Sequence, residues 1–130
     1  MCENVSVEER LVECSFLLPI VRDSDRAPHP PIVWRLLQDA IRATFPQGHS
    51  GPELLYRDVE SVPGEYVEDA TKRIVRDESR RYTIAISRSK LEDLRRLLRS
   101  VANTFDQKAI YLSVAGEVEF VMPRPEDGML

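Results

Sequence analysis

Alternating apolar and polar residues predict β-strands along the chain. In residues 11–21 the even-numbered side chains are all apolar, and the odd-numbered ones include the polar Glu13 and Ser15. This alternation is typical of a strand with one buried face. It predicts further strands over residues 81–87 and 109–121, and Gly116 indicates a bulge within the last one.

Apolar residues at helical spacing predict two helices. The first begins at Pro30-Pro31 and ends near Phe45, since proline is well tolerated in the first helical turn. The second follows Ser89-Lys90-Leu91-Glu92, a pattern that fits a capping box, and continues to Phe105.

The remaining segments are less patterned. Residues 62–67 and 73–76 read as the arms of a strand hairpin. We expect a flexible N-terminus over 1–10, a single domain over 11–121 and a flexible C-terminal tail over 122–130.

The order strand, helix, strand hairpin, strand, helix, strand predicts an α+β ferredoxin-like plait, βαββαβ. Right-handed crossovers place both helices on one face of a four-stranded antiparallel sheet, so its other face is open. Parity assigns the following side chains to that open face: Glu13, Ser15, Leu17, Arg81, Thr83, Ala85, Tyr111, Ser113, Ala115, Glu117 and Glu119. Small residues dominate its middle, which favours the close approach of a protein partner, a second copy in a homodimer, or a ligand.

Composition is that of a single globular domain, with 42% hydrophobic and 31% charged residues. The two cysteines do not suggest a disulfide framework, and Cys14 reads as a small core residue. The sequence has neither a signal-peptide pattern nor an apolar run long enough for a membrane span. We therefore expect a cytoplasmic protein that does not contact membranes.

Charge is unevenly distributed around a net value of −4. Residues 72–99 carry ten basic and four acidic side chains, so this segment is a candidate for nucleic-acid contact. The expected basic surface comprises Arg88, Lys90, Arg95, Arg96 and Arg99.

Recognised catalytic and metal motifs are absent from the sequence. His29 and His49 lie in proline- and glycine-containing loops without a second ligand at a useful spacing, and we expect them to be solvated. There is no Cys-x-x-Cys, no nucleophile elbow and no phosphate-binding glycine loop. We expect neither a bound metal nor a cofactor.

A polar cluster at the start of the third strand is a second candidate contact site. It contains Asp77, Glu78, Arg80 and Arg81 at one end of the sheet. A metal-dependent nuclease would need converging carboxylates, which Glu13 and the loop residues Asp23 and Asp25 could supply.

Four segments resemble small bacterial proteins of no assigned activity: Glu13-Cys14-Ser15-Phe16, the helix around Trp34, Asp77–Tyr82 and Ile110–Phe120. The resemblance spans roughly residues 11–121 and implies no catalytic residues. Its motifs fall on the open face and its margin, which directs attention to that face.

These observations favour a non-enzymatic binding or assembly module that acts through the open sheet face or edge. The candidate binding residues are Glu13, Ser15, Asp77, Glu78, Arg80, Arg81, Thr83, Tyr111 and Ser113. Two alternatives are left open: a small metal-dependent nuclease or other hydrolase that uses Glu13 and the Asp77–Arg81 cluster, and an electrostatic nucleic-acid binder.

Overall fold

The computed structural model describes residues 10–45, 60–67 and 74–130, with the backbone alone for 60–67 and 74–77. Its elements are β1 (Leu11–Pro19), α2 (Pro31–Thr44), β2 (Glu60–Val67), β3 (Ile74–Ser87), α3 (Leu91–Thr104), β4 (Ile110–Val114) and β5 (Glu117–Val121). Short 3-10 turns, η2 (Arg88–Lys90) and η3 (Pro125–Asp127), precede α3 and follow β5.

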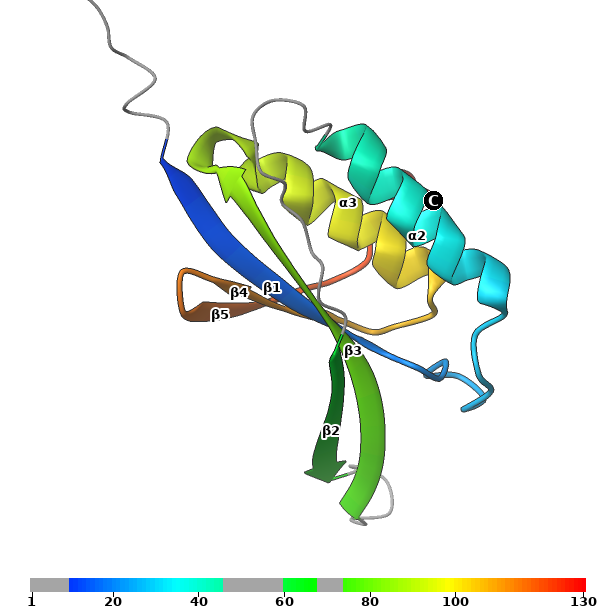
Figure 1. The fold of residues 1–130 in the computed structure, drawn as a ribbon. Helices are drawn as coiled ribbons and strands as arrows, with labels where there is room; N and C mark the ends of the chain where they lie inside the picture. Colours follow the sequence, from blue (N-terminus) through cyan, green and yellow to red (C-terminus); the bar gives the residue numbers. More distant parts are fainter. Residues whose placement is uncertain (1–9, 46–59, 68–73) are drawn as a thin grey trace, which may run out of the picture.

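The predicted ferredoxin-like α+β fold is confirmed. Within the described residues the sheet has five antiparallel strands in the order β2-β3-β1-β4-β5, which is the ferredoxin-like arrangement with β5 added beside β4. Figure 1 shows α2 and α3 side by side over one face of this sheet, as the right-handed crossovers require.

Strand β3 is longer than the sequence analysis predicts. The expected hairpin arm 73–76 and the strand 81–87 belong to one continuous strand, Ile74–Ser87. Its second half pairs with β1 as far as Pro19↔Ser79, and its first half pairs with β2. The β2–β3 hairpin consequently extends beyond the end of β1 (Figure 1). The expected N-terminal segment, apart from Arg10, lies outside the described residues.

The expected bulge at Gly116 is instead a turn, and the predicted last strand is a hairpin of two strands. Val114 pairs with Glu117, and Ala115 and Gly116 between them have φ values of 51° and 90°. Positive φ at both central residues defines the tight type I′ turn that matches strand twist. Glycine adopts this conformation freely, whereas alanine does so at a cost of about 1 kcal/mol.

This turn reverses the predicted orientation of every β5 side chain. Ser113 pairs with Val118 and Tyr111 pairs with Phe120, so Val118 and Phe120 lie on the open face, whereas Val121 is buried. Glu119 lies on the helix-covered side, where it accepts hydrogen bonds from Arg95 of α3. The expectation that Glu117 and Glu119 belong to the open face is therefore wrong.

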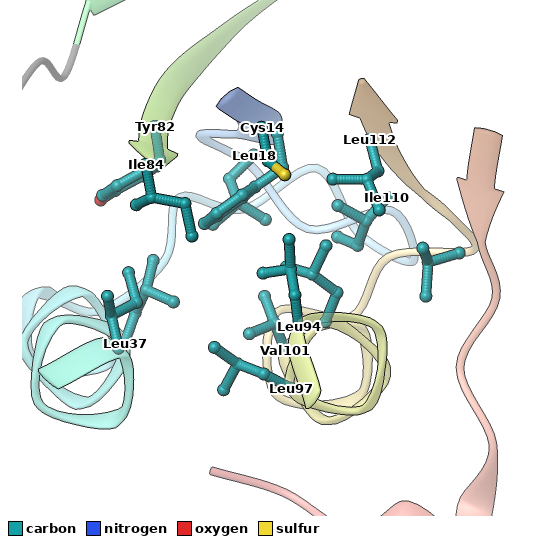
Figure 2. Packing of buried hydrophobic residues seen from close by; sticks show 14 of the residues in the cluster. Cys14, Leu18, Leu37, Tyr82, Ile84, Leu94, Leu97, Val101, Ile110 and Leu112 are labelled. Carbon is teal, nitrogen blue, oxygen red and sulfur yellow. The ribbon is translucent and has the colours of Figure 1, made fainter. Parts of the chain in front are cut away.

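The core lies between the sheet and the two helices, as Figure 2 shows. Even-numbered side chains of β1 and β3 face it, together with the apolar stripes of α2 and α3. The fully buried large side chains include Phe16, Leu18, Leu37, Leu94, Leu98, Val101, Phe105, Ile110 and Leu112. The strand parities and helix stripes of the sequence thus predict one common core, apart from β5.

Helix α3 begins differently from the prediction. The turn η2 precedes it, Lys90 occupies the cap position, and no side chain caps the helix. The Ser89 hydroxyl is instead hydrogen-bonded to the Ser87 hydroxyl at 3.1 Å, so the predicted capping box does not form.

Residues 122–130, for which the sequence predicts a flexible tail, contact α3 at several points. The Arg99 guanidinium binds Asp127 at 3.0 Å. The Asn103 side-chain amide donates to the carbonyls of Arg124 and Gly128, both at 2.9 Å. Leu130 packs against the core.

Candidate functional site on the open sheet face

The centre of the open face is a row of small side chains. Thr83, Ser15 and Ser113 lie side by side on β3, β1 and β4, and Val118 of β5 continues the row. Thr83, Ser15 and Ser113 are all partly accessible. Short side chains let another molecule approach the sheet closely, and their hydroxyls can donate and accept hydrogen bonds.

An adjacent row carries larger groups. It runs from Arg81 through Leu17 and Tyr111 to Phe120. The two aromatic rings meet edge to face with centroids 5.9 Å apart, and 63% of Phe120 is exposed. This row combines a guanidinium at one end with an accessible aromatic pair at the other.

On the opposite side of the small row stands Glu13. It pairs with Ala85 of β3, and its backbone carbonyl accepts a hydrogen bond from the Ala115 amide at 3.0 Å. With alanine on both sides, the Glu13 carboxylate is exposed on the sheet. It offers a negative charge within reach of whatever contacts the small residues.

The polar cluster predicted at Asp77–Arg81 is divided between the two faces. Arg80 points to the helix side, where its guanidinium carbon lies 3.9 Å from the centroid of a Trp34 ring. Tyr82 is buried on the same side and stacks on Phe16 at 5.3 Å. Glu78 is exposed, and the side chain of Asp77 lies outside the described part. Among the cluster residues whose side chains are described, Arg81 lies with the other open-face candidates.

The predicted basic surface of α3 is largely paired with acidic groups of the same chain. Arg95 forms a two-pronged ion pair with Glu119 at 2.9 and 3.0 Å, and its pKa is raised chiefly by that hydrogen bonding. Arg96 pairs with Asp93, and Arg99 pairs with Asp127. The charge available for phosphate contacts is therefore smaller than the sequence suggests.

The prediction that His29 is solvated is wrong. It is 7% exposed, its Nε2 lies 3.0 Å from the Pro19 carbonyl oxygen, and its ring packs edge to face on Trp34 and Phe105. Burial lowers the pKa of His29. His29 thus anchors the loop after β1, and His49 lies outside the described residues.

Both aspartates of that loop have structural roles. Asp23 accepts a hydrogen bond from the Lys108 amide at 2.8 Å. Asp25 accepts from the Ala27 amide and pairs with Arg22; the pKa of Asp25 is lowered chiefly by the amide. No group of metal-binding side chains occurs in the described ranges 10–45, 78–130. Among the described side chains, Glu13, Asp23 and Asp25 therefore do not form the metal-binding group that a nuclease would need.

Burial accounts for the chemistry of the one cysteine in the described part. Cys14 is fully buried, and desolvation raises the pKa of its thiol to about 11. A thiol in this state is a poor nucleophile.

None of the described helices combines the length and apolar character of a membrane span.

Comparison with known proteins links this fold to enzymes. No family model and no curated protein matches the sequence. Two solved structures match: a phage SAM lyase in complex with S-methyl-5'-thioadenosine and a phage SAM lyase in the apo state. The first has 13% identity and a TM-score of 0.57, and covers 92% of this chain and 91% of its own. The second has 13% identity and a TM-score of 0.53, with 92% and 90% covered.

At this identity the likeness establishes a shared fold. It also corrects the functional expectation, since both neighbours are enzymes and one holds a nucleoside. The non-enzymatic assembly module is therefore wrong, and the two solved structures lend no support to the alternatives offered with it, the nuclease and the nucleic-acid binder. A protein partner or homodimer stays a prediction.

Proposed function

We propose that this chain is a lyase that cleaves S-adenosylmethionine and releases S-methyl-5'-thioadenosine, with the substrate bound on the open sheet face. The observation that carries the proposal is the likeness, over 92% of the chain, to a SAM lyase that holds S-methyl-5'-thioadenosine. The exposed side chains of the open face supply chemical groups that suit each part of this substrate.

The proposed reaction breaks the bond between the sulfonium sulfur and Cγ of the methionine portion. Sulfur keeps both electrons and becomes a neutral thioether. The four-carbon portion either closes on its own carboxylate to form a lactone or loses a Cβ proton to a base. Both routes are redox neutral and need no cofactor.

Glu13 is best suited to the amino-acid end of the substrate. The positive charge on sulfur disappears as the bond breaks, so a carboxylate beside sulfur would stabilise the ground state more than the transition state. At the amino-acid end, Glu13 can pair with the ammonium group, and in the elimination route it can accept the Cβ proton.

The dimensions of the face agree with a ligand of this length. Glu13 and Leu17 are four residues apart on β1, a distance of roughly 13 Å at the rise of a β-strand. Phe120 lies in the same row as Leu17. A nucleoside with an attached amino-acid chain can span from the aromatic pair to the carboxylate across the small hydroxyl residues.

The test is direct. Purified protein is incubated with S-adenosylmethionine, and S-methyl-5'-thioadenosine is measured by liquid chromatography with mass detection. We expect release by the wild-type chain and at least a roughly tenfold lower kcat/KM for Glu13→Gln, since a hydrogen bond to a charged group contributes about 1.5–3 kcal/mol. Glu126→Gln, an exposed acid in η3, is the matched control.

Two results would count against the proposal in different ways. If the wild-type chain forms no S-methyl-5'-thioadenosine, the lyase activity is refuted. If Glu13→Gln and Glu126→Gln both retain full activity, the lyase stands but Glu13 has no part in it. The four-carbon product, a lactone or an unsaturated amino acid, distinguishes the two chemical routes.

A further inference from the structure

The aromatic pair on β4 and β5 is the least expected feature of the open face. Phe120 exposes 63% of its surface, Val118 on the same strand side exposes 49%, and Met122, just after the strand, exposes 61%. An aromatic side chain of this size is normally buried in a monomer, because its apolar surface is unfavourable in water. Such exposure in a row of neighbours indicates a contact surface.

The geometry of the pair leaves ring faces available. Tyr111 and Phe120 meet with an interplanar angle of 79°. In an edge-to-face pair each partner covers at most one face of the other, and Phe120 is largely exposed. The cross-strand register holds the two residues opposite each other on neighbouring strands, so the arrangement is fixed by the sheet backbone.

We propose that Phe120 and Tyr111 form the platform on which the adenine ring of a 5'-thioadenosine ligand stacks. This inference rests on the proposed function and identifies the part of the site that recognises the base. A neutral, planar purine is the portion of S-adenosylmethionine that an aromatic ring binds by stacking. Ser113, one position along on the open face, can offer its hydroxyl to the ribose.

A second copy of this chain is the main competing occupant of the same apolar surface. Apolar neighbours such as Val118 and Leu17 adjoin the aromatic pair, but the pair fits a nucleoside better because hydroxyl and charged groups continue both rows across the sheet. The row passes through Leu17 to Arg81, and the adjoining row is Ser113, Ser15 and Thr83. A polar floor next to an aromatic platform suits a ligand with one planar apolar end and several polar groups.

The experiment measures binding of S-methyl-5'-thioadenosine and of adenosine by calorimetric titration. We expect Phe120→Leu to weaken both by roughly 5- to 150-fold, as base–aromatic stacking predicts. Phe120→Trp, which keeps an aromatic ring at this position, retains binding. Met129→Leu, similarly exposed but in the C-terminal segment that contacts α3, is the matched control and leaves the dissociation constants unchanged. Unfolding by urea verifies that each variant folds.

The outcomes separate this inference from the lyase activity. Equal affinities of the wild type and Phe120→Leu overturn the platform, and so does a change in sedimentation mass without a change in affinity, which identifies an interface between copies. If the wild type binds adenosine through Phe120 but does not cleave S-adenosylmethionine, the platform stands and the lyase fails. If it binds neither nucleoside, the platform is refuted, and the lyase is judged by the release of S-methyl-5'-thioadenosine alone.

Discussion

The two faces of the sheet use the same strands for different purposes. On β1, the even-numbered residues from 12 to 18 face the helices and are at most 6% exposed, whereas Leu11 on the other face is 56% exposed. Adjacent residues of one strand thus serve either the core or the open surface. The comparison teaches that in this fold stability and ligand recognition can be changed separately, one residue apart.

The cause of the difference is the placement of the helices. Both crossover connections bring α2 and α3 to the same side, and α3 fills the layer above β4 and β5. The other side receives no layer within the described residues, so its side chains keep contact with solvent. Substitutions on the covered face should therefore mainly lower stability, and substitutions on the open face should mainly weaken binding.

The largest effect is expected on the covered face. Phe16 is fully buried and stacks on Tyr82, so Phe16→Ala leaves a cavity and lowers the free energy of unfolding by about 3–5 kcal/mol. Phe120→Ala removes the same ring from the open face, where its pair with Tyr111 is lost, and lowers the free energy of unfolding by about 0.5–1.5 kcal/mol. Urea titration of both variants gives the two values, and similar losses would contradict the two-sided description.

The stability of the protein is expected to depend on pH through His29, in the loop that follows β1. Because burial lowers the pKa of His29, the unfolded chain binds this proton more readily than the folded one. Stability is therefore complete above pH 6.5, the ordinary histidine value, and falls as the pH is lowered from there towards the depressed folded value.

The comparison for this prediction is His29→Gln. It removes the titrating ring, so the slope of unfolding free energy against pH between about 6.5 and 5 becomes smaller than in the wild type. The carboxylates with lowered pKa values, such as Asp106 beside Ser24, act at lower pH and do not interfere. An unchanged slope in His29→Gln would exclude His29 as the source.

A smaller loss is expected from the ion pair that joins α3 to β5. Arg95→Met breaks the two-pronged contact with Glu119, which is only partly screened by solvent, and should lower the free energy of unfolding by about 0.5–1 kcal/mol. Arg96→Met removes a more exposed pair with Asp93 and should have less effect. Thermal unfolding in low and high salt tests this order, and a larger loss for Arg96→Met would reverse our assignment.

The smallest effect on stability is expected in the row of small residues. Ser113→Val introduces a good strand former on the open face, so the free energy of unfolding should change by less than about 0.5 kcal/mol. The same change removes a hydroxyl and adds bulk beside the aromatic pair, and should weaken binding of S-methyl-5'-thioadenosine. Retained affinity in a stable Ser113→Val variant would place the ligand away from this row.

Much of the fold follows from the sequence because the helix stripes and the strands β1 and β3 agree on one core. The residues predicted for the open face on these strands, such as Ser15 and Thr83, lie there in the structure. Proline at the start of α2 was also informative, because the helix begins at Pro31 as the pattern predicts.

The β4–β5 hairpin could not be read from parity alone. In a two-residue turn, Val114 pairs with Glu117 on the same face, so even-numbered residues before the turn share a face with odd-numbered residues after it. Val118 and Phe120 therefore look like core residues in the sequence although they face outward. The signal was present in Ala115-Gly116, because glycine as the second central residue suits a type I′ turn.

The partners of charged groups were also beyond the reach of the sequence. Arg80 and Trp34 are far apart along the chain, and their contact depends on how α2 lies across β3. Likewise, the pairing of Arg95 with Glu119 required the correct orientation of β5. Contacts of this kind follow from tertiary packing, and local sequence patterns carry little information about it.

The buried thiol of Cys14 gives the molecule an internal reporter of its own opening. A thiol that is enclosed and has a pKa of about 11 reacts with iodoacetamide only when the sheet and helices separate. In a Cys2→Ser background a single alkylation event would then mark each excursion from the native state. The labelling rate, measured by mass spectrometry in the presence of a nucleoside, would register ligand binding as slower modification, without any engineered probe.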